Sequence, residues 1–343
     1  MKIISEACVV FGIKSLGITP QEIEYQGQGT LIKITRGGIC GSDLHYYQHG
    51  KVGAYAVKAP MILGHEVIGE VIASDDPTLG KGRTVAINPS KPCHVCKYCL
   101  GGDENQCVKM KFFGSAMYFP HIDGGFTQYK IVDSAQCIPF DPIVDGRIMV
   151  FAEPLAVAIH AVNQAGDITG KRVFISGVGP IGSLVVAVAK AKGAAEIVTA
   201  DPSERCRQLS LTLGADKSFA ADALEWTDYQ ADKGFFDIAF EASGHPSSQG
   251  RCLDVTRAKG TIVLVGMGGA IPEFPLMTVI AKELHLTGTF RFTGEFRTAV
   301  EWLEQHIIDP LPLLSAEYAQ PDFIQAMEFA GNKAVASKVQ IVF

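Results

Sequence analysis

The sequence predicts a two-domain α/β protein, in which a mostly β domain precedes a doubly wound parallel sheet. The chain has 343 residues, of which 47% are hydrophobic, so it is long enough to bury two cores. Up to about Pro142 its apolar residues form short runs interrupted by glycine, as in β domains. From Phe151 onward strand-like and helix-like stretches alternate, which indicates parallel strands with helices on both faces.

The individual elements are predicted from the spacing of their apolar residues. In the first half, short apolar runs predict strands at 29–35, 67–72 and 83–87. Apolar residues then recur at helical spacing and predict a helix that begins near Phe151. In the second half, strands are predicted at 172–176, 196–200, 236–240 and 261–265. The last predicted elements, which we expect to return to the first domain, are an amphipathic helix at 296–308 and a strand at 338–343.

Composition excludes several classes of partner. The chain has 30 Lys and Arg against 36 Asp and Glu, a net charge of -6, and lacks the basic stripe that a nucleic-acid backbone requires. No apolar stretch approaches the roughly 20 residues that span a bilayer, and the N-terminus lacks the apolar core of a signal peptide. Nine cysteines without a secretion signal suit a reducing compartment. We therefore expect a cytoplasmic protein with no nucleic-acid or membrane partner.

Four closely spaced cysteines predict a structural zinc site. They are Cys93, Cys96, Cys99 and Cys107. Two residues between successive cysteines let one tight turn aim its thiolates at a common point, and the chain then returns with the fourth. Four sulfur ligands leave no open coordination position, so the ion would stabilise the loop and take no part in catalysis. The alternatives are a disulfide pair or four unrelated thiols.

A glycine-rich turn predicts a dinucleotide site. It directly follows the predicted strand at 172–176 and consists of Gly177, Val178, Gly179, Pro180, Ile181 and Gly182. The three glycines suit a tight turn, close approach to a pyrophosphate and helix–strand packing, in that order. Asp201 ends the next strand, where a carboxylate accepts hydrogen bonds from a ribose and favours NAD. Arg205 and Arg207 lie close enough to leave NADP use open, and a glycine turn without a ligand is the alternative.

A second metal site is indicated by one cysteine and one histidine from separate loops, Cys40 and His65. A carboxylate could complete the set of ligands. Glu153 is the best candidate and Glu66 the other. Such a site leaves room for a water or a substrate oxygen, as catalytic zinc requires. Taken alone, Cys40 and His65 would more often be packing residues than ligands, and it is the neighbouring residues that favour the metal site.

These motifs together resemble the zinc-containing medium-chain dehydrogenases over nearly the whole chain, and within them the polyol dehydrogenases, to which sorbitol dehydrogenase belongs. The shared motifs are the four-cysteine loop, 38–46, 64–66, 153–155 and 290–291. The segments 88–93, 112–121 and 310–318 resemble sugar-acid members of that branch. The resemblance implies a GroES-like catalytic domain at 1–152 and 290–343, and a Rossmann domain at 153–289.

The resemblance also implies roles for residues around the metal. Cys40, His65 and Glu153 would hold the catalytic zinc, so that each subunit carries two zinc ions, and Glu66 would be an exchangeable carboxylate. Asp43 would orient His65 through its second ring nitrogen. Separately, Ser42 would bind the reacting hydroxyl and pass its proton through the nicotinamide ribose to His45.

Further contacts are implied for the cofactor and the substrate. Beyond the glycine turn, the cofactor contacts would be Asp201, Arg205, Val265, Gly266, Phe290 and Arg291. The substrate contacts would be Tyr46, Arg291, Lys111 and His121, the last three as candidates for binding a carboxylate. Sorbitol dehydrogenases commonly have tyrosine where this chain has Phe292, and their adenosine-side arginine lies one position later than Arg205.

The resemblance implies oxidation of L-idonate at C5 to 5-keto-gluconate, with hydride transfer to NAD or NADP. The main alternative is a polyol dehydrogenase that acts on sorbitol or xylitol. A catalytically silent nucleotide-binding protein on the same fold is a further alternative, although such proteins tend to lose the ligands that are present here. The family also implies a homodimer or homotetramer.

Overall fold

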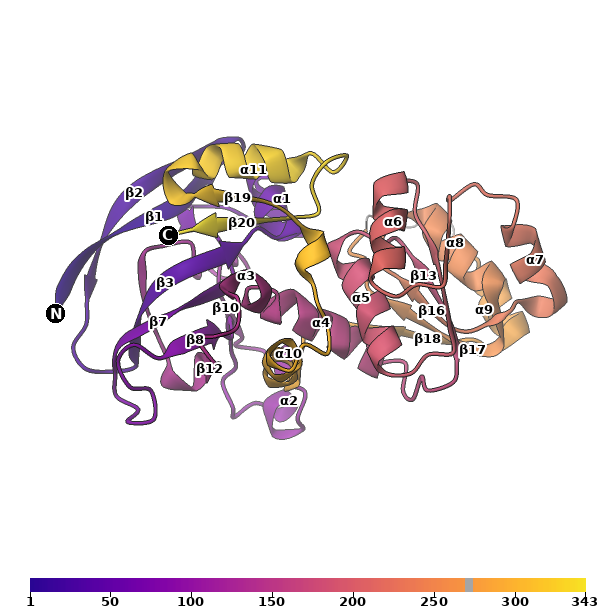
Figure 1. Ribbon diagram of the computed structural model, residues 1–343, viewed down its shortest axis with the longest axis horizontal. Coiled ribbons are helices and arrows are strands. Elements are labelled where there is room, and N and C mark those ends of the chain that lie inside the picture. The colour runs from indigo at the N-terminus through magenta and orange to yellow at the C-terminus, as the bar shows by residue number, and fades with distance from the viewer. Residues whose placement is uncertain (269–273) are drawn as a thin grey trace. The chain divides into compact units, whose positions relative to one another are not determined.

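The computed structural model describes residues 1–268 and 274–343 (Figure 1). By its internal contacts the chain divides into two compact units. Unit 1 comprises Met1–Glu153, Phe296–His306 and Leu314–Phe343, and unit 2 comprises Pro154–Glu295 and Ile307–Leu313. The limits given above for the functional domains stay a prediction. Within the described ranges no helix is both long and apolar enough to cross a membrane.

Unit 1 is built on a seven-stranded sheet of order β12-β8-β7-β3-β20-β19, in which β11 also pairs with β3. Its strands are β3 (Thr30–Gly38), β7 (Glu66–Ser74), β8 (Thr84–Ile87), β11 (Tyr129–Val132), β12 (Cys137–Pro139), β19 (Leu314–Ala319) and β20 (Lys338–Val342). The pairs are antiparallel except for β19 with β20. The C-terminal strand therefore joins the sheet of the N-terminal half, as predicted.

Smaller elements surround this sheet. A three-stranded sheet has the order β2-β1-β6, and two short hairpins pair β4 with β5 and β9 with β10. These strands are β1 (Lys2–Gly12), β2 (Ser15–Glu24), β4 (Lys51–Val52), β5 (Tyr55–Ala56), β6 (Met61–Ile62), β9 (Ser90–Lys91) and β10 (Lys111–Phe112). The helices are α1 (Gly41–His49), α2 (Lys97–Leu100), α3 (Gly146–Met149) and α11 (Phe323–Gly331).

Unit 2 is a parallel six-stranded sheet of order β15-β14-β13-β16-β17-β18. Its strands are β13 (Arg172–Ser176), β14 (Glu196–Ala200), β15 (Lys217–Phe219), β16 (Phe236–Glu241), β17 (Thr256–Leu264) and β18 (His285–Gly288). The direction in which strands are added reverses between β13 and β16, so the loops after these two strands face one crevice. The predicted doubly wound fold is confirmed.

The helices of unit 2 cover both faces of its sheet. They are α5 (Pro180–Ala191), α6 (Glu204–Thr212), α7 (Trp226–Gln230), α8 (Pro246–Val255) and α9 (Leu276–Lys282). Contacts join α5 to α6, and α8 to both α7 and α9, and Figure 1 shows the strands between these two groups. Because the central strands are covered on both faces, they are almost continuously apolar.

Two helices cross the border between the units, α4 (Ala152–Asn163) and α10 (Glu295–Glu304). The helix predicted at 296–308 is wrong at its C-terminal end. His306 adopts a left-handed φ of 53°, which stops the helix at Glu304. The edge strands β15 and β18 were not predicted, because each has only three or four residues.

A partly buried carboxylate at the start of α10 links it to α4. Glu295 accepts hydrogen bonds from His160 Nδ1 at 2.9 Å, Asn163 Nδ2 at 3.0 Å and the Thr293 amide at 2.8 Å. Burial by itself raises the pKa of Glu295, but these donors outweigh it and bring the pKa down to about 2. A folded-state pKa below the ordinary value of 4.5 means that the carboxylate stabilises the fold above that pH.

We expect Glu295→Gln to lower the unfolding free energy by about 1–3 kcal/mol near neutral pH, because the donors lose a charged acceptor. The difference from the wild type should shrink as pH falls from about 5 toward 2, since the wild-type carboxylate is then protonated. Denaturant midpoints across this range measure it, with the exposed Glu301→Gln on the same helix as control. A deficit that does not change with pH would contradict this assignment.

Candidate functional site

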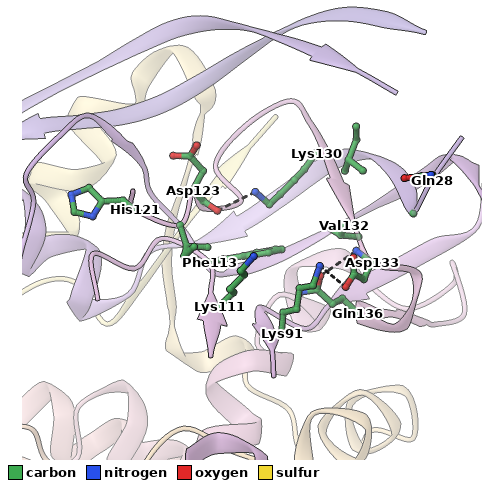
Figure 2. A pocket seen from close by; sticks show the side chains of 13 residues that line it. Gln28, Lys91, Lys111, Phe113, His121, Asp123, Lys130, Val132, Asp133 and Gln136 are labelled. Atoms are coloured by element: carbon green, nitrogen blue, oxygen red, sulfur yellow. Dashed lines mark hydrogen bonds and ion pairs between the residues drawn. The ribbon is translucent and has the colours of Figure 1, made fainter. Parts of the chain in front are cut away.

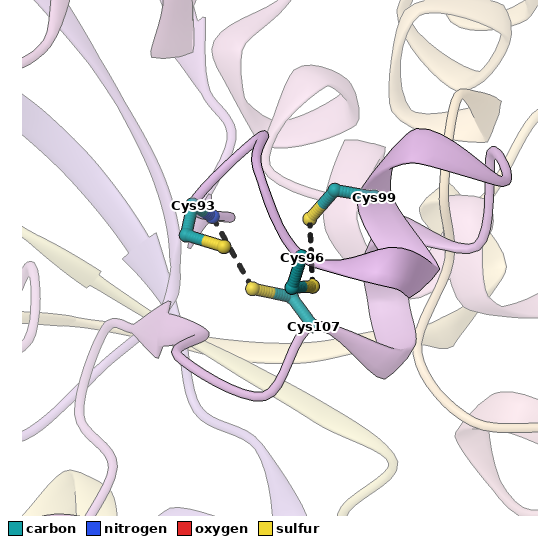
Figure 3. Close-up of side chains that lie close together, drawn as sticks. All are labelled: Cys93, Cys96, Cys99 and Cys107. Carbon is teal, nitrogen blue, oxygen red and sulfur yellow. Dashed lines mark hydrogen bonds between the residues drawn. The ribbon is translucent and has the colours of Figure 1, made fainter.

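The four cysteines of the predicted zinc loop converge on one point. Their sulfur atoms lie within 4.8 Å of one another (Figure 3). Cys96 caps the N-terminus of α2 and Cys99 lies within that helix, so a single helical turn presents both sulfurs. Cys107 returns after the 3-10 turn Glu104–Gln106. The nine cysteines are free thiols, so the disulfide alternative does not apply.

The geometry and charge of this cluster fit a zinc ion. The sulfurs of Cys96 and Cys99 are 3.5 Å apart, close to the edge of about 3.8 Å of a tetrahedron with zinc–sulfur bonds near 2.3 Å. Amide groups of Cys99 and Val108 point at the Cys96 sulfur and lower its pKa to about 6. The Cys107 sulfur accepts from the Cys93 amide at 3.2 Å. Such donors favour thiolates, the form that binds metal.

A second cluster forms within unit 1 from Cys40, His65 and Glu66, whose ligand atoms lie within 4.8 Å of one another. Cys40 is the N-cap of α1, and His65 directly precedes β7. Gly64 makes this loop feasible, because its φ is +88° and a Cβ there would lie 2.1 Å from the Phe126 ring. Two loops distant in sequence thus bring a thiol, an imidazole and a carboxylate together.

Asp43 ties these two loops to each other. It is fully buried, and its carboxylate accepts from the Cys40 amide at 2.9 Å and from the Gly64 amide at 3.0 Å. Its distance to His65 Nδ1 is 4.0 Å, which is an ion-pair distance and longer than a hydrogen bond. Asp43 therefore fixes the backbone beside both ligands, and its orientation of the His65 ring stays a prediction.

Negative charge accumulates around His65. Burial by itself lowers the pKa of His65, but the charges of Cys40 and Asp43 reverse the shift and bring the pKa to about 10. Glu153, which is also buried, contributes in the same direction. Thiolate and carboxylates crowded around an imidazole are a donor set that a divalent cation would neutralise. The residues present therefore fit a zinc ion at this cluster.

Sequence reasoning missed the cation that lies behind this cluster. Lys338, buried at the start of β20, donates from Nζ to both oxygens of Glu66 at 2.7 Å and to the Ile39 carbonyl at 3.2 Å. Burial alone lowers the pKa of Lys338, but Glu66 and then Cys40 outweigh it and raise the pKa. A lysine at a strand end predicts only an exposed side chain, so no local signal reveals this pair.

Ser42, His45 and Tyr46 lie on α1, directly after Cys40. His45 is exposed, and its pKa is lowered by partial burial and then by His49 and Lys333, so its imidazole is neutral over a wider pH range. Tyr46 is buried, and its hydroxyl oxygen accepts from the Ala116 amide at 3.0 Å. The predicted contacts of these three residues stay predictions.

Lys111 does not point toward the metal cluster. The next residue, Phe112, is buried with its ring 5.5 Å from the His65 ring. Because successive side chains of a strand point to opposite faces, Lys111 in β10 projects away from His65. It lines a separate pocket, together with His121.

Both ring nitrogens of His121 form hydrogen bonds with backbone groups. Its Nε2 accepts from the Lys58 amide at 2.8 Å, which leaves Nδ1 to donate to the Tyr118 carbonyl at 2.8 Å. This assignment requires the neutral imidazole. The ring therefore holds two loops together and offers no positive charge to a carboxylate.

In unit 2, the glycine turn has the shape of a phosphate-binding loop. Gly177 has a φ of +87°, and a Cβ on Gly182 would lie 1.9 Å from the Gly177 carbonyl oxygen, so the helix can approach the strand only with glycine. A Cβ on Gly179 would meet nothing within 4 Å. Space is therefore kept open on the loop itself, beside the N-terminus of α5, where Pro180 occupies the first turn.

Asp201 lies at the end of β14 and supports this loop. Its carboxylate accepts from the Val178 amide at 2.9 Å and the Ser203 amide at 2.8 Å. Arg207 donates to the Asp201 carbonyl and pairs with Glu204, so its guanidinium is engaged locally. Each oxygen of this carboxylate has a further lone pair, which could accept a hydrogen bond from a ribose hydroxyl.

Glu241, at the end of β16, was also missed. It is fully buried, and its side chain accepts from the amides of Ser243 and Gly244 at 3.0 Å. Its backbone carbonyl accepts from the amides of Val265 and Gly266, both at 2.8 Å. Glu241 thereby holds two predicted cofactor residues in place. Its position at the carboxyl end of a strand beside the crevice is the signal that could have identified it.

Elsewhere in unit 2, Arg291 has a left-handed φ of 54°, and its guanidinium lies 4.8 Å from the centre of the Phe290 ring. The guanidinium therefore stacks on this ring, and the cofactor contacts of Phe290 and Arg291 stay predictions. Phe292, which replaces a tyrosine of the polyol enzymes, is 2% exposed and belongs to the core.

We expect Cys96→Ser to remove the structural zinc, because serine oxygen is a poorer zinc ligand than thiolate. Elemental analysis should then show about one zinc ion per chain where the wild type holds about two, with a lower denaturation midpoint. Cys206→Ser, outside both clusters, is the matched control. A variant that keeps its zinc and its stability would refute the structural role.

We expect Lys338→Met to lower the unfolding free energy by about 3–5 kcal/mol, because Glu66 would remain buried without its cation. The double variant Lys338→Met/Glu66→Gln should recover much of this loss, since neither partner is then charged. Equilibrium denaturation of the two variants measures this coupling. A single variant as stable as the wild type would show that the ion pair is unimportant.

Comparisons with known proteins identify the family. Residues 26–142 match the model of the alcohol dehydrogenase GroES-like domain, and residues 180–305 match that of the zinc-binding dehydrogenases. The chain is 60% identical to L-idonate 5-dehydrogenase (NAD(P)(+)) of Escherichia coli K12 over 343 residues, which is 100% of both chains. It is 35% identical to D-xylulose reductase A of Aspergillus niger over 309 residues, 87% of this chain and 85% of that one.

Solved structures give the same result. The crystal structure of L-idonate 5-dehydrogenase from Escherichia coli K-12 matches with a TM-score of 0.99 and 59% identity, covering 100% of this chain and 99% of that one. That of 2R,3R-butanediol dehydrogenase from Bacillus subtilis matches with a TM-score of 0.88 and 25% identity, covering 99% of each chain. With a GroES-like half, a zinc-dehydrogenase half and a full-length relative at this identity, the chain belongs to the zinc-binding alcohol dehydrogenase family.

Proposed function

We propose that this chain oxidises L-idonate at C5 to 5-keto-D-gluconate, reversibly, with hydride transfer to NAD or NADP. The observation that carries the proposal is 60% identity to an L-idonate 5-dehydrogenase over the full length of both chains. The convergence of Cys40, His65 and Glu66 supports it, because a dehydrogenase of this family needs such a cluster. Oxidation of sorbitol or xylitol is the alternative, favoured by the more distant D-xylulose reductases.

Within unit 1, Cys40, His65 and Glu153 would hold the catalytic zinc, with Glu66 as an exchangeable carboxylate. When bound, the ion would act as a Lewis acid that lowers the pKa of the substrate hydroxyl. Lys338 donates to both oxygens of Glu66, and this competition suits a carboxylate that would bind the metal only in exchange. Asp43 holds the two loops that carry the other ligands in register.

The chain's own residues would then move the proton. Ser42 would accept a hydrogen bond from the substrate hydroxyl, and the proton would leave through the cofactor ribose to His45 and solvent. The lowered pKa of His45 keeps its imidazole neutral and able to accept that proton. The electron pair of the C5–H bond leaves with the hydride to the nicotinamide, and a ketone remains.

For the cofactor, the open space at Gly179 and the N-terminus of α5 would accept the pyrophosphate, and Asp201 the ribose. Arg205 lies near enough in sequence to tolerate a 2'-phosphate. The remaining proposed contacts are Val178, Pro180, Ile181, Gly177, Gly182, Val265, Gly266, Phe290 and Arg291.

For the substrate carboxylate we retain Arg291, because Lys111 projects away from His65 and His121 is neutral. Tyr46 is retained as a proposed substrate contact, and the backbone amide of Ala116 fixes its position by donating to its hydroxyl oxygen. We also propose a homodimer or homotetramer in the cytoplasm, without nucleic-acid or membrane partners. The net charge of -6 supports the absence of a nucleic-acid partner.

Steady-state rates with L-idonate and sorbitol, each with NAD and NADP, test the proposal. We expect kcat/KM for L-idonate to exceed that for sorbitol by about 100-fold or more. The cation that pairs with the carboxylate of L-idonate would have no anionic partner when a polyol is bound. Glu153→Ala should lower kcat by about 100-fold or more while folding and NAD binding persist. The exposed Glu328→Ala serves as control. Faster oxidation of sorbitol would favour the alternative.

A further inference from the structure

A pocket of about 470 Å³ opens in unit 1, and its lining side chains include Lys91, Lys111 and Lys130 (Figure 2). Because Lys111 projects away from His65, the pocket lies on the opposite side of β10 from that histidine. Lysines from three strands line it: Lys91 of β9, Lys111 of β10 and Lys130 of β11. Neither Cys40 nor His65 is among its lining residues. The pocket is therefore distinct from the metal cluster, and its volume lies in the range that binds small organic molecules.

Two of these lysines are directly opposite each other. Lys111 and Lys91 are register partners in the hairpin of β9 and β10, so their side chains leave the same face. Like charges in this relation are destabilising unless an anion compensates them. Asp133 pairs with Lys91 at 2.6 Å. The side-chain ammonium of Lys111 makes no hydrogen bond or ion pair with any residue that the structure describes.

The third lysine is held over an aromatic ring without a carboxylate partner. Lys130 Nζ lies 4.4 Å from the centre of the Phe113 ring and donates to the Asp123 backbone carbonyl at 3.1 Å. Burial lowers the pKa of Lys130 to about 8, although the charge of Asp123 raises it in part. The Asp123 carboxylate itself accepts from the Ile62 amide at 3.0 Å. Burial thus disfavours the charged form of Lys130, and a bound anion would stabilise that form.

The charges of the lining do not cancel. Asp123 and Asp133 oppose the three lysines, and His121 is neutral because both its ring nitrogens serve the backbone. Lys111 and Lys130 are the cations that remain without a carboxylate of their own. Gln28 and the carboxylates of the two aspartates also line the pocket, and such hydrogen-bonding groups suit hydroxyls.

We propose that this pocket is a second binding site for a small hydroxylated monocarboxylate, a sugar acid, whose carboxylate lies between Lys111 and Lys130. One excess positive charge matches a monocarboxylate better than a dianion, and Gln28 and the two aspartates would bind the hydroxyls of the same molecule. The choice of a sugar acid among such carboxylates rests on the proposed function. The protein could then bind a sugar acid at this site without oxidising it.

Calorimetric titration of the zinc-loaded protein with D-gluconate tests this site. We expect two binding events per chain, one of which weakens by about tenfold or more in Lys111→Gln, because a charged hydrogen bond is lost. Lys130→Met, which keeps the packing on Phe113, should weaken the same event. It provides the test if Lys111→Gln folds poorly. The exposed Lys81→Gln should leave both events unchanged.

A single binding event that neither lysine variant alters would overturn the proposal. So would an event that responds to both variants when inorganic phosphate is the probe but is absent with D-gluconate, because the site would then select phosphate. The readout is binding and not turnover. A chain that fails to oxidise L-idonate but shows the lysine-dependent event would refute the proposed function and retain this site.

Discussion

The accumulation of buried negative charge around His65 is the constraint on which unit 1 depends. Cys40, Asp43, Glu66 and Glu153 converge there, and carboxylates are stable away from water only when a cation or several donors compensate them. The chain supplies one such cation, Lys338, which pairs with Glu66. The backbone amides of Cys40 and Gly64 compensate Asp43. What remains is a thiolate, an imidazole and carboxylate, a set suited to zinc.

Sheet topology makes this compensation feasible. The central strand β3 pairs with β7 on one side and with β20 on the other. Gly38, near the end of β3, is opposite Glu66 in one pair and Gln340 in the other. A Cβ at Gly38 would lie 2.2 Å from the Glu66 carboxylate, so only glycine leaves room for the carboxylate that Lys338 binds. The C-terminal strand is thus part of the structure that surrounds the metal-binding cluster of the N-terminal half.

In unit 2 the constraint is different. A phosphate-binding loop must leave space for its ligand while its own backbone stays packed. Gly177 and Gly182 are held against Ser243 and against each other, at distances that no Cβ could occupy. Gly179 alone borders open space. Glu241 and Asp201 then satisfy the amides of the flanking loops. The loop is therefore rigid where it meets protein and open where a ligand would bind.

The sequence by itself determined the fold class, the zinc loop and the glycine turn, because each depends on residues that are close in the chain and whose spacing is set by local geometry. Cys93 to Cys107 and Gly177 to Gly182 are such cases. It could not reveal Lys338 or Glu241, or the direction of Lys111, since their partners are distant in sequence. Only the tertiary structure decided that a lysine near the C-terminus is buried against Glu66 and that Lys111 faces a second pocket. Burial and strand register assign these partners, and neither is encoded in any short segment.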